Sequence, residues 1–279
     1  MRKKLTVIVL TLFAFFMSYP ILFLLVGSVM SQRELQDNLK QILSGGFGYA
    51  SWSIFPRYPT LKFFVETLID SPDFFLMFWN SVKLVVCILG GQLLIGVPAA
   101  WGFAKYKFPF KKIIFLIYII LMMMPFQVTM LSNYLVLNNM KLIDMHASII
   151  LPAVFSTFPI FIMYRFFCGI PDSIIESAKI DGASALLVFT KIGLPLGSAG
   201  VISAMVLGFL EYWNLIEKPL AFLKTKALWP LSLYLPNITL NEAGQAFAAS
   251  IITLIPAILV FFGGQDYLEQ GIVAAASKE

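Results

Sequence analysis

Residues 74–103 read FFLMFWNSVKLVVCILGGQLLIGVPAAWGF, an apolar run in which Lys83 is the one charged side chain. A helix that crosses a bilayer needs about 20 apolar residues, and this run exceeds that length. The whole chain follows the same trend, since 59% of its 279 residues are hydrophobic, 13% are charged and its mean hydropathy is +0.85. Roughly a quarter of the residues are charged in a water-soluble domain. The sequence therefore predicts a protein that is solvated by lipid.

Similar apolar runs recur along the chain and predict an all-α membrane protein with about six transmembrane helices. The expected spans are residues 5–29, 74–103, 113–136, 147–168, 196–216 and 247–264. Several spans carry a proline, which is tolerated in lipid where neighbouring groups satisfy the carbonyl that the proline leaves free. A packed bundle with an internal path is therefore favoured.

The N-terminal segment has the charge order of a signal peptide, with three basic residues at positions 2–4 before an apolar stretch at 5–30. The stretch is longer than the roughly 7–15 residues of a signal-peptide core, and it lacks a small-x-small cleavage site. Residues 1–30 are therefore expected to remain as the first transmembrane helix. Residues 31–73 mix charged residues with glycine and proline, which predicts an extracytoplasmic loop. Residues 74–279 then form a core of about five helices.

Lysine and arginine near the ends of the spans predict the orientation of the chain, because short cytoplasmic loops are rich in these residues. Basic residues precede the first span and crowd the turn at 104–112, which places both segments in the cytoplasm. With an even number of spans, both termini and the connection at 169–195 are also cytoplasmic. The segment at 218–226 is also basic, although this topology places it on the outer side.

Composition and residue types argue against several other functions. The net charge of +5 resides in the short segments between spans, so binding to nucleic acid is not indicated. Cys87 and Cys168 lie within predicted spans without metal-binding spacing and are interpreted as apolar fillers. His146 is the one histidine, so no metal site is predicted, and it is interpreted as a solvated boundary residue. No phosphate-binding loop or hydrolase motif occurs, so we predict no catalytic residue and no bound cofactor.

The connection at 169–195 reads GIPDSIIESAKIDGASALLVFTKIGLP and is too polar to span a membrane. Asp172 or Ser173 is expected to N-cap a short helix, in which Ile174, Ile175 and Ala178 face the membrane domain. Asp181-Gly182 then breaks the pattern, and a second short helix follows at 183–190. The result is a helix, a turn and a helix that lie parallel to the membrane.

Two interpretations of this connection are possible from its residues. Small side chains at 177, 178, 182 and 183 would let a partner backbone approach, while Glu176 and Asp181 offer acceptors to an arginine of a cytosolic protein. Alternatively, the helix rests on the lipid surface, but such helices usually carry many basic residues, and this one has only Lys179 and Lys191.

The same residues resemble the EAA loop of binding-protein-dependent ABC importer permeases. The motif residues in this chain are Glu176, Ser177, Ala178, Asp181, Gly182, Ala183 and Pro195, the last within Ile192-Gly193-Leu194-Pro195. Ser177 replaces an alanine of the family pattern, which is a change between two small residues. Further resemblance over about residues 75–278 points to the carbohydrate branch, in particular the maltose-type second permease. It lies in Ala104-Lys105-Tyr106-Lys107-Phe108-Pro109, Met124-Pro125, Leu151-Pro152, Trp213-Asn214, Pro219-Leu220 and Tyr267-Leu268.

This resemblance implies a heterodimer with a second permease subunit, two cytosolic ATPase subunits and an extracytoplasmic solute-binding protein, in a bacterial cytoplasmic membrane. Residues 74–279 would be the permease core, and the helix within 169–195, between the fourth and fifth spans, would couple it to an ATPase. Glu176 would bind an ATPase arginine and Gly182 would allow close approach. The implied function is ATP-driven import of a solute, expected to be a sugar or oligosaccharide.

A sugar site needs aromatic faces and hydrogen-bonding groups, so candidate residues along the substrate path can be chosen from the sequence. They are Asn133, Tyr134, Glu211, Tyr212, Trp213 and Asn214. The alternative function is a stand-alone, ion-coupled secondary transporter, a class expected to show internal repeats and buried ionisable residues. The sequence shows no clear repeat and few charges in its spans.

Overall fold

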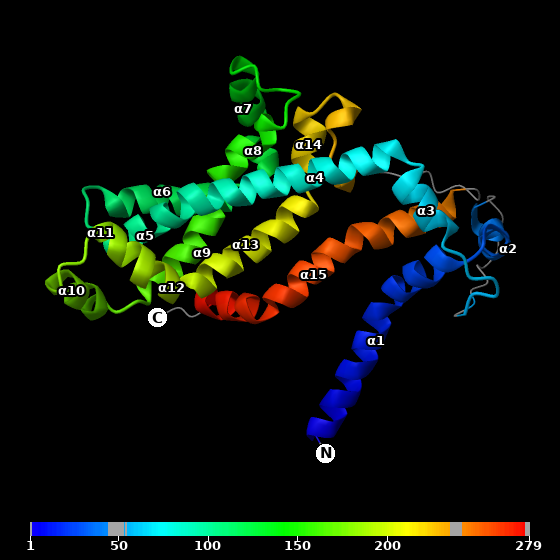
Figure 1. Cartoon of the computed structure of the whole chain (residues 1–279), viewed down its shortest axis with the longest axis horizontal. Helices are drawn as coiled ribbons and strands as arrows, with labels where there is room; N and C mark the ends of the chain where they lie inside the picture. Colours follow the sequence, from blue (N-terminus) through cyan, green and yellow to red (C-terminus); the bar gives the residue numbers. More distant parts are fainter. Residues whose placement is uncertain (1, 44–52, 54, 235–241, 277–279) are drawn as a thin grey trace. The chain divides into compact units, whose positions relative to one another are not determined.

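The computed structural model describes residues 2–43, 53, 55–234 and 242–276, and every regular element in these ranges is a helix (Figure 1). The α-helices are α1 Arg2–Val29, α2 Gln32–Leu43, α3 Lys62–Ile69, α4 Pro72–Gly91, α5 Val97–Lys105, α6 Lys111–Met123, α7 Phe126–Asn139, α8 Ala147–Val154, α9 Thr157–Cys168, α10 Asp172–Ile180, α11 Ala185–Val188, α12 Leu194–Leu196, α13 Ser198–Trp213, α14 Glu217–Phe222 and α15 Ala243–Ala276. Two π-helical turns, η1 Gln92–Gly96 and η2 Phe189–Gly193, and two 3₁₀ turns, η3 Lys226–Leu228 and η4 Leu231–Leu233, complete the set.

The predicted number of spans is confirmed. Four helical segments in the described ranges are long and apolar enough to cross a membrane, and the number rises to six if each of two bent helix pairs counts as one span. The four are Lys4–Val29, Pro72–Lys105, Ala147–Cys168 and Ala243–Glu269. All overlap predicted spans. The chain therefore has the helical composition of a multi-pass membrane protein.

The third predicted span, 113–136, is not one straight helix. Helices α6 and α7 meet at an angle of 106° at Met124-Pro125. A residue before proline is disfavoured in the helical region, and Met124 is accordingly extended, with φ −76° and ψ 119°. The proline therefore interrupts the span. The fifth predicted span is preceded by a similar bend of 68° between the Ala185–Leu196 and Ser198–Trp213 segments.

The described residues divide into two compact units. Unit 1 comprises residues 1–76 and 234–256, and unit 2 comprises 77–233 and 257–279. In unit 1, the predicted outer loop contains the two helices α2 and α3. Their buried residues pack with the end of α1 and the start of α15, and the core consists of Met30, Leu35, Leu39, Phe63, Ala243 and Ala248. The loop is therefore folded on an apolar core of its own.

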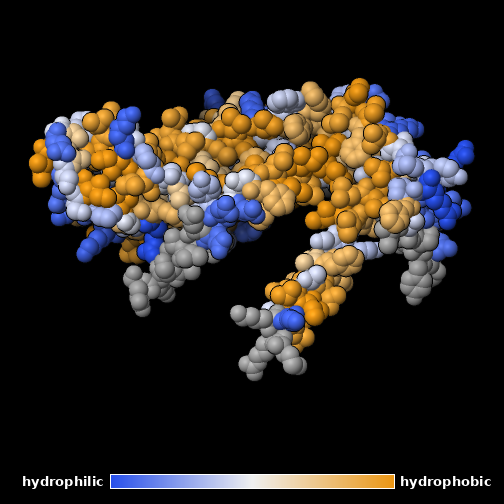
Figure 2. All heavy atoms as spheres, turned by 60° about the horizontal axis from the view of Figure 1, so that its bottom comes forward, coloured by the Kyte–Doolittle hydropathy of each residue, from blue (hydrophilic) through white to orange (hydrophobic). Residues whose placement is uncertain are grey.

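Helix α1 leaves most of its own apolar side chains uncovered. None of its most apolar 18-residue window is buried, and Phe15 and Phe16 are exposed. Figure 2 shows hydrophobic side chains over most of the visible surface of this helix, which ends in grey atoms near the bottom of the view. Such a surface is stable only against lipid or another apolar partner. This exposure agrees with the expected role of α1 as a transmembrane helix.

Unit 2 is built around α9, which packs against both α5 and α13 (Figure 1). Trp101, Met163 and Phe167 are almost fully buried at the centre of this packing. Glycines permit close contacts between the elements: a Cβ at Gly193 would lie 2.7 Å from the ring of Trp101, and one at Gly197 would lie 2.2 Å from the ring of Phe167. This core positions the connection at 169–195.

Candidate functional site

The connection at residues 169–195, here called the docking loop, forms the predicted helix, turn and helix (Figure 1). Helix α10 begins directly after Pro171, which is extended and occupies the N-cap position without a side-chain cap. The prediction that Asp172 or Ser173 caps this helix is therefore wrong. Proline has a fixed φ compatible with this boundary, and Asp172 instead becomes the first helical residue.

A C-terminal cap of the Schellman type ends α10. Gly182 has φ +82°, its amide donates to the carbonyl of Lys179, and the amide of Ala183 donates to the carbonyl of Ala178 at 2.9 Å. Glycine is favoured at this position because side chains disfavour positive φ. No atom lies within 4 Å of where a Cβ of Gly182 would stand, so the backbone conformation requires this glycine rather than any contact within the chain.

The second short helix begins at Ala185, two residues later than predicted. Ser184 is its N-cap, with the side-chain oxygen accepting from the amide of Leu187 at 3.3 Å. Helix α11 then covers Ala185–Val188, and the π-helical turn η2 and helix α12 lead into α13. Pro195 is exposed within α12, and its carbonyl accepts a hydrogen bond from Ser198 at 2.8 Å, next to the bend before α13.

The docking loop has an inner apolar face and an outer face. Ile175 and Val188 are buried in the core of unit 2, and Ala178 and Ala183 pack against that core. The prediction that Ile174 also faces the membrane domain is wrong, since 42% of this residue is exposed. The loop is therefore attached to unit 2 along one side of α10 and α11.

The outer face combines acidic and apolar groups. Glu176, Ser177 and Asp181 are exposed, as the docking interpretation requires. Ile180 and Leu186, which the sequence analysis did not single out, are 86% and 71% exposed. Figure 2 shows the same mixture of blue and orange at the left-hand end of the view, where α10 and α11 lie. Exposed apolar groups with polar residues around them are typical of a surface that contacts another protein or a membrane.

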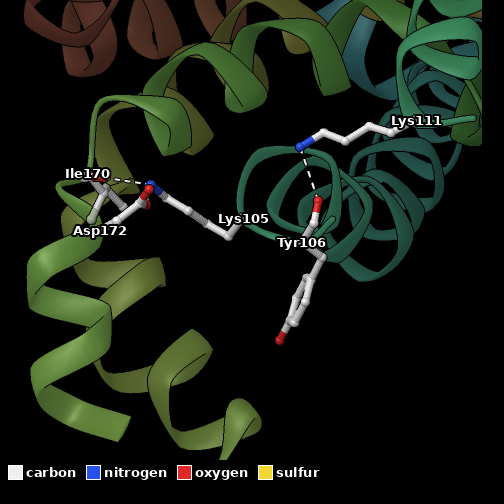
Figure 3. Close-up of polar contacts among 5 residues, drawn as sticks. All are labelled: Lys105, Tyr106, Lys111, Ile170 and Asp172. Atoms are coloured by element: carbon white, nitrogen blue, oxygen red, sulfur yellow. Dashed lines mark hydrogen bonds and ion pairs between the residues drawn. The ribbon is translucent and has the colours of Figure 1, made fainter. Parts of the chain in front are cut away.

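Lys105 reaches the docking loop from the last turn of α5. Its ammonium lies 2.5 Å from the carbonyl oxygen of Ile170 and 2.7 Å from Oδ1 of Asp172 (Figure 3). The hydrogen bond and charge of Lys105 hold the pKa of Asp172 below its usual value. The sequence did not predict this contact, because nothing local to Lys105 identifies a partner 67 positions away.

The six residues proposed for the substrate path occupy different environments. Tyr212 and Trp213 are 2% and 3% exposed, and the hydroxyl of Tyr212 accepts from Gln92 at 2.9 Å. Glu211 and Asn214 are exposed, and the Asn214 side chain donates to the carbonyl of Leu210. The remaining pair, Asn133 and Tyr134, is half-buried on α7. In this conformation, two of the six therefore take part in internal packing.

His146 is buried rather than solvated, so the sequence interpretation of this residue is wrong. It is 9% exposed, and its Nε2 lies 2.9 Å from the carbonyl oxygen of Leu228. Within the part of the chain that the structure describes, no group of three or more His, Cys, Asp or Glu side chains could hold a metal ion. The histidine serves as a hydrogen-bonding group at the start of α8.

A family described as "Binding-protein-dependent transport system inner membrane component" matches residues 92–274, which include the docking loop and more than half of the chain. The chain belongs to this family. It is therefore a multi-pass component of the inner membrane and a transporter subunit rather than an enzyme, which confirms the predicted family.

Two named relatives illustrate the similarity. The chain is 25% identical over 268 residues to the arabinooligosaccharides transport system permease protein AraQ of Halalkalibacterium halodurans, covering 95% of this chain and 92% of the relative. It is 26% identical over 263 residues to the sn-glycerol-3-phosphate transport system permease protein UgpE of Salmonella typhimurium, covering 88% and 82%.

Two solved structures share the fold. A bacterial ABC transporter involved in the import of the acidic polysaccharide alginate matches with a TM-score of 0.78 and 20% identity, covering 95% of both chains. A bacterial alginate ABC transporter in complex with an alginate pentasaccharide-bound periplasmic protein matches with a TM-score of 0.60 and 17% identity, covering 94% of this chain and 91% of that chain.

Proposed function

We propose that this chain is the membrane-spanning permease subunit of an ATP-binding cassette importer. It acts with a second permease subunit, two cytosolic ATPase subunits and an extracytoplasmic binding protein that delivers the solute. The chain itself binds no cofactor, and its partner ATPases hydrolyse ATP. In this arrangement the docking loop and both termini are cytoplasmic.

The docking loop is the observation that carries this proposal. Its inner face is anchored by Ile175 and Val188, while Glu176, Ser177 and Asp181 remain exposed on the outer face. A helix held in this way transmits a force applied to its outer face into the membrane core. ATP binding that favours one of two packings of the subunits would then alternate access to the path.

The solute is proposed to be a sugar or oligosaccharide. The named relatives transport arabinooligosaccharides and sn-glycerol-3-phosphate, and both solved structures concern alginate import. All of these solutes carry hydroxyl groups, which hydrogen-bond to amide and carboxylate side chains, and sugar rings also pack on aromatic faces. The candidate path residues are of these types. They are Asn133, Tyr134, Glu211, Tyr212, Trp213 and Asn214.

The test compares Glu176→Gln and Gly182→Ala with the parent in complexes reconstituted with the ATPases and the binding protein. Glu176→Gln removes the exposed charge and preserves the shape, and Gly182→Ala opposes the positive φ of the turn. Both should lower the amount of copurified ATPase and the solute-stimulated hydrolysis by roughly tenfold or more, the scale expected when one partner of a buried charge pair is lost.

Asp70→Asn is the matched control, because Asp70 is also an exposed carboxylate but lies in the predicted extracytoplasmic segment. This variant should copurify with as much ATPase as the parent. The docking role is contradicted if Glu176→Gln and Gly182→Ala complexes assemble and transport like the parent. ATP-independent transport by the chain alone would favour an ion-coupled transporter instead.

A further inference from the structure

Three helix ends meet at Lys105. This residue is the last of α5, Ile170 lies just beyond the end of α9, and Asp172 is the first residue of α10. The C-terminal ends of helices carry partial negative charge and the N-terminal ends partial positive charge. A cation between two C-terminal ends and an anion at the adjacent N-terminal end are therefore both favourably placed.

The Lys105 ammonium makes two short contacts, one part-buried and one exposed. Its donors are 2.5 Å from the Ile170 carbonyl and 2.7 Å from the Asp172 carboxylate (Figure 3). The Lys105 side chain is 8% exposed, while that of Asp172 is 76% exposed. Because most of the Lys105 side chain is buried, losing either partner would leave its charge less well compensated, which costs stability. Ile170 is itself buried, so its carbonyl also depends on this donor.

The same helix holds the far end of the docking loop through Trp101, one turn before Lys105. Its ring packs edge-on against Phe167 at a centroid distance of 5.4 Å and lies 5.7 Å from the ring of Phe189 in η2. A Cβ on Gly193 would stand 2.7 Å from this ring. Helix α5 therefore contacts the loop both where it begins, after α9, and where it ends, before α13.

We propose that Lys105 is a positioning residue that clasps the docking loop to α5, so that movement of the loop is passed to the Pro72–Lys105 span. This inference rests on the proposed function. The chain connects the loop directly only to α9 and α13, while Lys105 lies 65 positions before Ile170. Through this clasp, a third span moves with the loop.

The alternative is that this contact only stabilises the fold. Ion pairs that are open to water contribute little stability, and Asp172 is largely exposed. A purely structural role would change the stability of the chain without changing how the loop and α5 move together. The test therefore needs one mechanical and one transport readout.

The mechanical readout is the distance between spin labels at Lys107, just after α5, and Lys179, on α10, both exposed. It is measured on the purified chain with Cys87 and Cys168 replaced by serine. Lys105→Met should broaden the distance distribution, Asp172→Asn should do so less, and Lys105→Arg should restore the parent distribution. Lys111→Met is the matched control, because Lys111 donates to Tyr106 in the same turn and not to the docking loop (Figure 3).

The transport readout is the amount of solute imported per ATP hydrolysed by the full complex. Lys105→Met should retain the copurified ATPases and their ATP hydrolysis, while the solute imported per ATP falls several-fold below the parent value. Asp172→Asn should give a smaller loss. Lys111→Met should match the parent.

The two proposals fail in different ways. If the parent complex shows no ATP-driven import, the proposed function is wrong, but the distance measurement still tests the clasp because it requires neither ATPase nor solute. Unchanged distances and unchanged solute per ATP in Lys105→Met would overturn the clasp, even with a lower melting temperature. If Lys105→Met does not fold, the exposed Asp172→Asn variant decides, and a parent-like result in both readouts overturns the proposal.

Discussion

Two regions of unit 2 satisfy their backbone hydrogen bonds in different ways. The docking loop satisfies its own backbone through α10, the turn at Gly182 and α11, and it is attached to the unit by apolar packing and by Lys105. The segment at 214–233 contains only the short helices α14, η3 and η4, and it is held by hydrogen bonds from side chains elsewhere in the chain. Asn80 donates to the carbonyls of Ala227 and Trp229 at 2.8 and 3.0 Å.

Further polar side chains bind the same segment. Ser81 accepts from the amide of Leu231 at 2.8 Å, and the Asp144 carboxylate accepts from the amides of Lys224 and Thr225 at 2.8 Å. Many bonds of this kind resist movement, because each would leave an unsatisfied group if it were broken. The difference indicates a docking loop that can move as a body and a 214–233 segment that is held in place.

The largest expected effect comes from the packing beside the docking loop. Gly197→Ala should lower the free energy of unfolding by about 2–3 kcal/mol, because the new Cβ would overlap the buried ring of Phe167. Gly102→Ala is the control, since no atom lies within 4 Å of its Cβ position. Thermal unfolding in detergent should show a lower midpoint only for Gly197→Ala, and equal midpoints would contradict the packing.

The next effect tests the 214–233 segment. Asn80→Ala should cost about 1–2 kcal/mol, because it leaves two carbonyls in a partly buried site without their donor. The exposed Asn214→Ala should change stability by less than about 0.5 kcal/mol. Limited proteolysis should cut the segment faster in Asn80→Ala, and a parent-like cleavage rate would mean that Asn80 does not hold it.

A smaller effect is expected at Asp144, which has φ +63°. Asn tolerates this conformation and keeps an acceptor, so Asp144→Asn should destabilise the chain less than Asp144→Ala. Hydrogen bonds from Thr225 lower the pKa of Asp144, so its stabilising contribution is complete above the usual aspartate pKa and is lost as pH falls through the lowered value. Thermal unfolding midpoints at neutral and acid pH measure the contribution of Asp144. Identical pH profiles for the parent and Asp144→Asn would show that Asp144 makes no such contribution.

The smallest effect is expected at His146. Burial lowers its pKa, the charge of Lys83 lowers it further and the Leu228 carbonyl partly offsets both. Asp144 lines the same surface pocket as Lys83 and His146. Below about pH 6.5, His146 is protonated in the unfolded chain more readily than in the folded chain. The free energy of unfolding therefore decreases as the pH is lowered. His146→Gln should remove this step from the pH profile of the unfolding midpoint, and an unchanged step would assign it to another group.

The features that the sequence predicted correctly depend on local signals. The number of spans follows from the length of apolar runs, since each helix must satisfy its own backbone in lipid. The helix, turn and helix of the docking loop follow from Pro171 and Gly182, whose backbone preferences act within a few residues. The break at Met124-Pro125 was not predicted, because residues 113–136 were expected to form one span.

Only the tertiary structure decided which distant groups meet. The sequence did not predict that Lys105 pairs with Asp172. It also did not predict that Tyr212, Trp213 and His146 are buried. In an apolar bundle many helix faces look alike in sequence, and the choice of neighbour depends on shape complementarity summed over many weak contacts. The sequence by itself therefore determined a multi-pass membrane protein with a helix, a turn and a helix at 169–195, while packing decided which side chains link that connection to the spans.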